Sequence, residues 1–182
     1  MKNPPVNPIA RQSQAWLTEA LLRLMERKPF AEITVTEITQ KAGLSRRTFY
    51  RIFTTREEVL AHYADTLYAE FVEQLQAQST LDYQEVMRLY FQFWYTHKSF
   101  LLLLKRDDLL PMIAQQYGRY FPEVFRMVKA DHPLAHDPEA LSYVMAYSAG
   151  GLFSLLLRWA EDSMEKTPEE MMALVEKTLR KI

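Results

Sequence analysis

Arginine and hydroxyl side chains are concentrated in one short stretch of the first third of the chain. Residues 45–51 read Ser-Arg-Arg-Thr-Phe-Tyr-Arg, and Arg56 follows five residues later. A guanidinium group can donate paired hydrogen bonds to a guanine edge or bind a phosphate, and hydroxyl groups can contact either. The stretch therefore predicts contact with nucleic acid, the alternative being an ordinary solvated basic face.

The charge distribution points the same way. The whole chain of 182 residues carries a net charge of −1. Residues 1–60 hold ten Lys and Arg against six Asp and Glu, a net +4, which leaves −5 for residues 61–182. Only the first third is expected to meet a polyanion.

Capping signals show how this stretch is positioned. Thr34 followed by Glu37 is a capping box that starts one short helix, and Gly43 suits the left-handed residue that ends it. Ser45 is an N-cap for a second short helix, from Arg46 to about Arg51. Two short helices joined by a tight turn form a helix-turn-helix, whose second helix enters the major groove with its first residues nearest the bases.

The predicted DNA contacts lie at the start of the first short helix, along the second, and at the start of the next long helix. Phe53, and less firmly Phe49, is expected in the core, with Leu44 plugging the space between the two helices. The predicted DNA-binding residues are Thr34, Thr36, Ser45, Arg46, Arg47, Thr48, Tyr50, Arg51 and Arg56.

Composition favours an all-α fold. Only four residues are Gly, about 2% against a usual ~7%, and none is placed to build a Gly-rich phosphate loop. There is no Cys, which excludes disulfides and thiol chemistry. We assign no catalytic residue, cofactor or metal site; His132 and His136 are four apart, but Pro133 lies between them in a predicted loop.

The capping pattern predicts about nine helices: an N-terminal three-helix helix-turn-helix head on a C-terminal helical bundle for ligand binding and dimerisation. Residues 1–8 are expected to be a flexible arm, 9–60 the DNA-binding domain with its motif at about 35–54, and 61–182 a regulatory and dimerisation domain. The longest apolar run is five residues, and no signal peptide is visible, so we expect a soluble, cytoplasmic protein without membrane contact.

The first third resembles the DNA-binding domain of the tetracycline-repressor (TetR-like) family over residues 10–62. This sequence departs from the family pattern at Thr39, where Ala is usual, at Arg47, where Gly is common, and at Arg56, where Lys is usual. Arg47 adds charge and length at a DNA-facing position, so it is expected to alter site preference. The matching residues are Thr34-Val35, Ile38, Ala42-Gly43-Leu44-Ser45, Thr48-Phe49-Tyr50, Phe53, Glu57 and Val59-Leu60.

Residues 90–104 and 150–171 are similar to the branch that includes the dihydroxyacetone-kinase operon regulator. The resemblance implies an aromatic effector pocket, whereas the plain alternative is that a helical bundle needs large core side chains. Some members of that branch answer to a partner protein instead of a small molecule. The candidate pocket residues are Tyr90, Phe93, Trp94, His97, Tyr117, Phe121, Phe125 and Tyr147.

Two adjacent glycines inside an apolar helix cost roughly 1 kcal/mol each relative to Ala, which close packing against another backbone would offset. We interpret this helix and the last one as a homodimer surface, the alternative being packing within one chain. The candidate interface residues are Tyr143, Tyr147, Gly150, Gly151, Ser154, Met171, Leu174, Val175 and Thr178.

Together these features predict a homodimeric transcription regulator, by default a repressor released by a small-molecule or protein effector. Its two recognition helices would lie about 34–36 Å apart on a pseudo-palindromic operator in double-stranded DNA. The competing hypotheses are an all-α enzyme or carrier that binds a small molecule in its aromatic core, and a helical body that serves as a docking site for a co-regulator.

Overall fold

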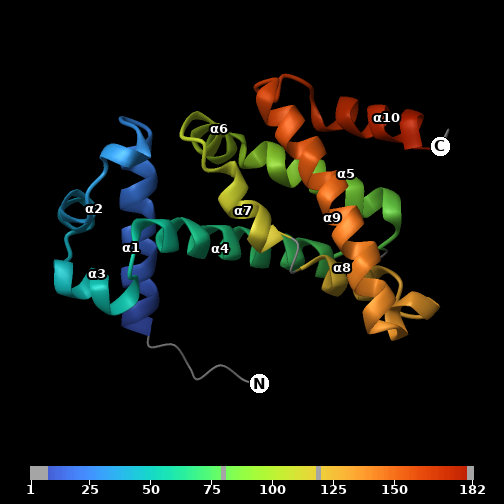
Figure 1. Ribbon diagram of the computed structural model, residues 1–182, viewed down its shortest axis with the longest axis horizontal. Helices are drawn as coiled ribbons and strands as arrows, with labels where there is room; N and C mark the ends of the chain where they lie inside the picture. Colours follow the sequence, from blue (N-terminus) through green and yellow to red (C-terminus); the bar gives the residue numbers. More distant parts are fainter. Residues whose placement is uncertain (1–7, 79–80, 118–119, 180–182) are drawn as a thin grey trace. The chain divides into compact units, whose positions relative to one another are not determined.

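The all-α fold is confirmed. A computed structural model describes residues 8–78, 81–117 and 120–179, and within these ranges it has ten α-helices, two short 3₁₀ turns and no strand (Figure 1). The additional α-helix lies in the stretch that holds Pro111 and Pro122. Each proline occupies the second position of a helix, where its missing N–H costs nothing, so the two prolines begin α7 and α8 instead of interrupting one helix.

The chain divides into two compact units, Met1–Asp65 and Thr66–Ile182. The division falls inside α4 (Arg56–Gln76), five residues later than the boundary the sequence suggested. Pro8, expected in the arm, is the first residue of α1, whereas the rest of the predicted arm and Gly118 lie outside the described residues.

The first unit is built on α1 (Pro8–Met25), which packs against α2 (Val35–Ala42) and α3 (Arg46–Ile52). A 3₁₀ turn, η1 (Phe30–Glu32), joins α1 to α2. The core is formed by fully buried apolar side chains from all of these elements and from the start of α4. They include Leu17, Leu21, Met25, Ile33, Ile38, Phe49 and Val59.

The predicted caps set the bounds of α2 and α3. Thr34 and Glu37 form the reciprocal capping box, Gly43 ends α2 with a φ of 66°, and the Ser45 side chain accepts the Thr48 amide. The Thr55 side chain likewise caps α4 by accepting the amide of Glu58. These local hydrogen bonds satisfy helix-end amides, which is why both short helices begin where the sequence predicts.

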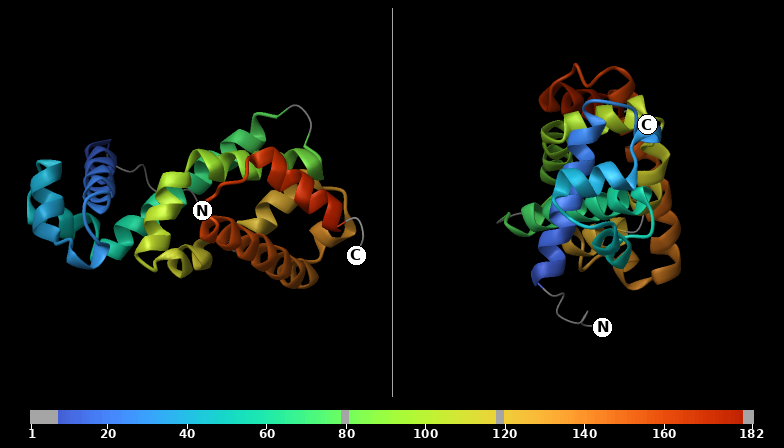
Figure 2. Two further views of the ribbon diagram at one scale, coloured as in Figure 1. Left: turned by 90° about the horizontal axis from the view of Figure 1, so that it is seen from above. Right: turned by 90° about the vertical axis from the view of Figure 1, so that its left-hand side faces the viewer.

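The second unit contains the rest of α4 and six further helices (Figure 2). Its last helix, α10, packs against α5, and α9 contacts α6, α7 and α8. Buried aromatic side chains of α5 meet Trp159 of α9 in the core. The bounds are α5 (Tyr83–Thr96), α6 (Lys98–Arg106), α7 (Leu110–Tyr117), α8 (Phe121–Val128), η2 (Pro133–His136), α9 (Pro138–Glu161) and α10 (Pro168–Leu179).

Helix α9 is long and apolar enough to cross a membrane by length and composition, and only 22% of its most apolar window is buried. A single helix of this kind is weak evidence for a membrane span, because core helices of soluble proteins pass the same test. The length of the longest unbroken apolar run did not indicate this helix, because serines and glycines interrupt its apolar residues.

Candidate nucleic-acid interface

Helix α3 has one buried side and one exposed side. Phe49 is fully buried, and its ring lies 6.0 Å from that of Phe53, which is 5% exposed. Tyr50, the next residue along, is 53% exposed. Because Phe49 anchors the helix in the core, the opposite side must face outward. We call its exposed residues the recognition face: Arg46, Arg47, Tyr50 and Arg51.

The guanidinium groups on the recognition face are not neutralised within the unit. Within the described residues, Arg47 and Arg51 have no side-chain hydrogen bond or ion pair, and α3 has no acidic residue in its first turn. The Arg46 guanidinium carbon lies 5.9 Å from the centre of the Tyr50 ring. The donors of all three arginines are therefore accessible to an anionic partner.

The hydroxyl groups predicted to touch DNA are partly engaged in shaping the motif. The Ser45 Oγ accepts the Thr48 amide at 3.0 Å and lies 2.9 Å from the Thr48 Oγ1. The Thr34 hydroxyl donates to Glu37 at 2.8 Å and accepts the Glu37 amide. Thr36 is exposed on the first turn of α2. These contacts position the ends of α2 and α3, whereas Thr36 and Tyr50 offer exposed hydroxyl-bearing side chains.

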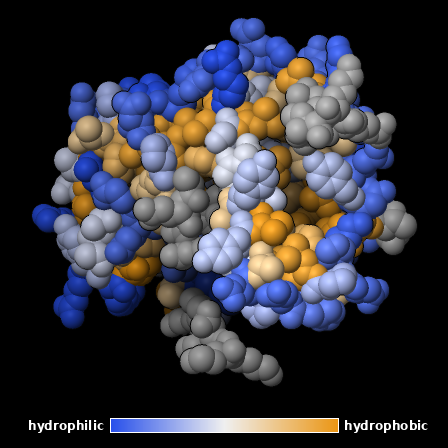
Figure 3. Space-filling model, turned by 45° about the vertical axis from the view of Figure 1, so that its right-hand side comes forward, coloured by the Kyte–Doolittle hydropathy of each residue, from blue (hydrophilic) through white to orange (hydrophobic). Residues whose placement is uncertain are grey.

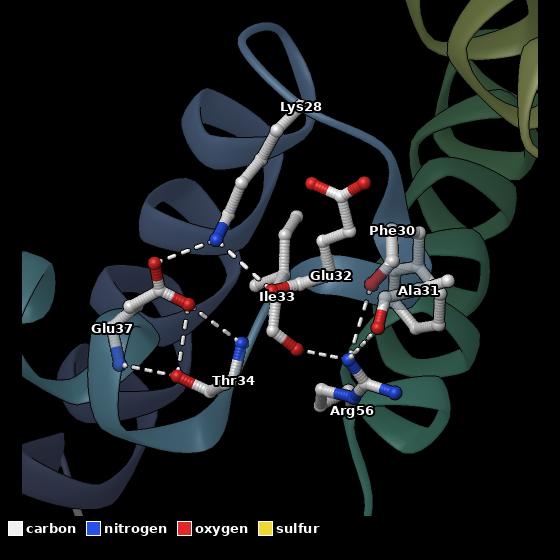
Figure 4. A network of polar contacts seen from close by, with 8 residues as sticks. All are labelled: Lys28, Phe30, Ala31, Glu32, Ile33, Thr34, Glu37 and Arg56. Carbon is white, nitrogen blue, oxygen red and sulfur yellow. Dashed lines mark hydrogen bonds and ion pairs between the residues drawn. The ribbon is translucent and has the colours of Figure 1, made fainter.

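A polar network fixes the start of α2 (Figure 4). Lys28 Nζ donates to Glu37 Oε1 at 2.6 Å and to the carbonyl oxygen of Glu32 at 3.0 Å. The hydrogen bonds from Lys28 and from Thr34 lower the pKa of Glu37 from 4.5 to about 2. Sequence reasoning missed Lys28, because a spacing of nine residues across a turn leaves no periodic signal.

Arg56 occupies a different place from the other predicted DNA contacts. Its Nη1 donates to the carbonyl oxygens of Phe30, at 3.1 Å, Ala31, at 3.4 Å, and Ile33. Its guanidinium carbon also lies 4.8 Å from the centre of the Phe30 ring. The side chain is 25% exposed and is directed at the η1 turn instead of away from the unit.

Two family models match the chain. Residues 17–63 match the model described as bacterial regulatory proteins of the tetR family, and residues 81–181 match the one described as a transcriptional regulator C-terminal region. The second match alone covers more than half of the chain.

The chain belongs to the tetR family. It is a DNA-binding transcriptional regulator, and the expected helix-turn-helix lies within the matched N-terminal region. Both matched regions are those of regulators, which points away from an enzyme.

Two individual proteins are similar to this chain. The chain is 40% identical over 60 residues to the HTH-type transcriptional regulator EthR of Mycolicibacterium smegmatis. That segment spans 33% of this chain and only 28% of EthR. The crystal structure of Lin0861 from Listeria innocua is similar with a TM-score of 0.78, over 98% of this chain and 95% of that one. At 15% identity, this likeness shows the shared fold alone.

In this tetR-family protein, the described residues of the predicted pocket lie on or beside several helices of the second unit. Tyr90, Phe93 and Trp94 are buried on α5, where the Tyr90 hydroxyl donates to the carbonyl oxygen of Leu152 at 3.2 Å. Phe121 and Phe125 are half-buried on α8. Tyr147 is 86% exposed, so it does not line an interior cavity of the unit, and the Tyr117 side chain lies outside the described residues.

His97 lies beside the aromatic side chains of α5. Its ring centre lies 4.5 Å from that of Phe93, and burial lowers its pKa. Its Nε2 is buried without a hydrogen-bond partner among the described residues, 3.7 Å from Glu70 Oε1. By contrast, His132 and His136 belong to no group of three or more potential metal-binding side chains in the described ranges. His132 Nδ1 accepts a hydrogen bond from the Leu134 amide.

The predicted interface residues divide into exposed and buried groups. Tyr143 is 75% and Tyr147 86% exposed, and Leu174 on α10 is 46% exposed. Met171 and Val175 are 3% and 7% exposed, because they face the core of their own unit, and so they are removed from the interface set. Thr178 has no described side chain.

Five of the exposed residues on α9 are spaced three or four apart along one helical side, which we call the apolar face: Tyr143, Tyr147, Gly150, Gly151 and Ser154. Among the described residues, a methyl group added at Gly150 or Gly151 would meet nothing within 4 Å, so close packing against this part of the chain explains neither glycine. Figure 3, which turns the α9 and α10 side of the chain forward, shows orange apolar side chains at the surface between hydrophilic ones.

Proposed function

We propose that this tetR-family regulator is a homodimeric repressor that binds a pseudo-palindromic operator through the recognition face of α3. The observation that carries the proposal is the set of outward-facing arginines on a helix anchored by buried Phe49. A dimer with two-fold symmetry requires two such helices about 34–36 Å apart, one DNA turn, to occupy successive major grooves.

Arg46 and Arg47 are the proposed base-reading residues. They occupy the first two positions of α3, and the first residues of a recognition helix lie nearest the base edges. Paired hydrogen bonds from Arg to the O6 and N7 atoms of guanine are the commonest specific contact in the major groove. Arg51, in the last turn, and Tyr50 are better placed for the phosphate backbone.

The apolar face of α9 is the proposed dimer contact. Exposed tyrosines beside two open glycines form an apolar surface that a second copy of the helix could approach closely. Leu174 of α10 extends the apolar surface offered by the second unit. The same exposure explains why α9 resembles a membrane span in composition while belonging to a regulator that works on DNA in the cytoplasm.

The proposed effector is a small molecule that binds beside the aromatic side chains of α5. The buried Nε2 of His97 supports it. This atom lies 3.7 Å from Glu70 Oε1 and makes no hydrogen bond among the described residues, and buried polar atoms are normally hydrogen-bonded, so a ligand oxygen would supply that bond. The resemblance to the dihydroxyacetone-kinase operon regulator leaves a protein co-regulator as the alternative. An effector that prefers one arrangement of the two heads would shift the dimer away from the DNA-binding state.

Selection from a random-sequence duplex pool with the wild-type protein tests the proposed function. We expect enrichment of a pseudo-palindrome, and binding that weakens with salt in proportion to the phosphates neutralised. Enrichment of no sequence at low or physiological salt would contradict the proposal. Adding candidate metabolites to the selected complex then distinguishes a small-molecule effector, which releases the DNA, from a protein effector.

A further inference from the structure

Arg56 joins two elements that are 23 to 26 residues apart in the sequence. Its Nη1 donates to three carbonyl oxygens, those of Phe30 and Ala31 in η1 and that of Ile33, the residue after η1. The guanidinium carbon lies 4.8 Å from the centre of the Phe30 ring, and Phe30 is itself 5% exposed. Figure 4 shows the three oxygens converging on this one nitrogen.

The carbonyl groups at the end of η1 explain the attraction. The last carbonyls of a helical turn have no partner within the turn and carry partial negative charge, which favours a cation beside them. Phe30 O already accepts the Ile33 amide at 3.0 Å, and the guanidinium adds a second hydrogen bond to the same oxygen. Arg56, which belongs to α4, therefore supplies hydrogen bonds to carbonyl groups of η1.

We call the hydrogen bonds from Arg56 to the carbonyl oxygens of Phe30, Ala31 and Ile33 the clamp. The clamp lies next to the segment that leads into the recognition helix. Ile33, one of the clamped residues, immediately precedes Thr34, the N-cap of α2, and α2 leads through the Gly43 turn into α3. On the other side of the clamp, Arg56 is the first residue of α4, the helix within which the chain passes from the first unit to the second. The contact thus lies where α4 meets the start of the helix-turn-helix.

We propose that Arg56 is a positioning residue for operator binding: it fixes the start of α4 to the η1 turn, so that α2 and α3 follow any displacement of α4. The inference rests on the proposed function, and it replaces the sequence-based expectation that Arg56 contacts DNA. A guanidinium already directed at three backbone oxygens is poorly placed to serve as a phosphate ligand.

Salt dependence separates positioning from phosphate contact. Loss of one phosphate contact lowers the slope of log affinity against log salt by about 1, whereas loss of a positioning contact weakens binding without changing the slope. Lysine is equally informative, because it keeps the charge but lacks the planar fork and reach of the guanidinium. Arg56→Lys should therefore behave like Arg56→Gln if positioning is the role, and like wild type if charge alone matters.

The experiment measures affinity for the duplex selected by the wild-type protein, at several salt concentrations, for Arg56→Lys and Arg56→Gln. The matched control is Arg23→Gln, which removes an arginine of the same unit that is 62% exposed and paired only within α1. Active fractions are titrated at high DNA concentration, below the melting temperature of each variant. Affinities then refer to folded protein.

We expect both Arg56 variants to bind at least about fivefold more weakly with an unchanged salt slope, and the control to stay within about twofold of wild type. Amide exchange at Ile33, whose N–H is bonded to Phe30 O, should accelerate in both variants. Wild-type affinity in Arg56→Lys, or a slope reduced by about 1 in Arg56→Gln, would overturn the inference. If the wild-type protein selects no duplex, the proposed function itself fails, which is a separate outcome.

Discussion

The recognition face of α3 and the apolar face of α9 are both exposed sides of helices anchored in a core, yet their chemistry is opposite. The first carries three arginines and a tyrosine, and the second carries two tyrosines, two glycines and a serine. Exposed cations cost little in water and attract a polyanion, whereas exposed apolar surface favours burial against another apolar surface. This difference underlies our two proposals, that the first face binds DNA and that the second contacts a second copy of the chain.

The largest effect is expected from placing negative charge on the apolar face, which tests whether this face forms the dimer contact. In the double variant Tyr143→Glu and Tyr147→Glu, two carboxylates would have to be buried in the dimer contact, so the protein should become monomeric by sedimentation. Because two linked heads gain roughly 100-fold or more in avidity, operator affinity should fall by at least that factor while half-site affinity is unchanged.

The matched control for that variant is Tyr83→Glu, because Tyr83 is 54% exposed at the first residue of α5 and does not belong to the apolar face. It should remain dimeric. A double variant that still sediments as a dimer would show that the apolar face of α9 has another partner.

The next largest effect tests the recognition face. Arg47→Ala should weaken binding to the selected operator by about 1–3 kcal/mol and relax the preference at one base position. Arg51→Ala should weaken binding to all duplexes about equally, with a salt slope lower by about 1. Competition binding against single-base operator variants measures both. If Arg47→Ala behaves as we expect for Arg51→Ala, Arg47 is a phosphate contact and does not read bases.

A smaller effect is expected at the glycines. Gly151→Ala should favour the helix by about 1 kcal/mol, since nothing within the chain contacts the added methyl group. If two α9 helices approach closely, the same methyl group meets the partner copy and weakens the dimer. We therefore expect a higher melting temperature at low concentration together with a raised dimer dissociation constant. A dimer as tight as wild type would place Gly151 outside the close contact.

The smallest effect concerns acid stability of the first unit. The folded pKa of Glu37, about 2, lies below its ordinary value of 4.5, so the unfolded state binds the proton more readily. The stabilisation is therefore complete above pH 4.5 and is lost as the pH falls toward 2. Glu37→Gln should flatten the melting temperature over this window, and Glu73→Gln, an exposed carboxylate on α4, should not. Parallel pH profiles for Glu37→Gln and wild type would contradict the role of the network.

The sequence predicted local structure in the first unit well, for a physical reason. Caps such as Thr34 with Glu37 and Ser45 with Thr48 are made between residues three apart, so their spacing is visible in the sequence. Gly43 likewise indicates, by being a glycine, the left-handed backbone conformation found at that position. The Arg56 clamp and the Lys28 ion pair join residues far apart in sequence, and only folding brings these groups together.

The second unit was harder to predict because apolar residues on a long helix do not reveal which side is covered. Met171 and Val175 read as interface residues but face the core, whereas Tyr147 was assigned to both the pocket and the interface and is 86% exposed. Aromatic residues on α5 suit a core as well as a ligand site. Which neighbour covers each side depends on the arrangement of several helices, and no local spacing encodes it.

The most direct test of the central claim is selection of duplexes from a random pool, followed by the number of chains bound per duplex. The account predicts a pseudo-palindrome with half-sites about one helical turn apart, bound by two chains and released by salt. It also predicts that the variant lacking the arginines at 46, 47 and 51 enriches nothing. Enrichment of the same sequence by that variant would contradict recognition through α3.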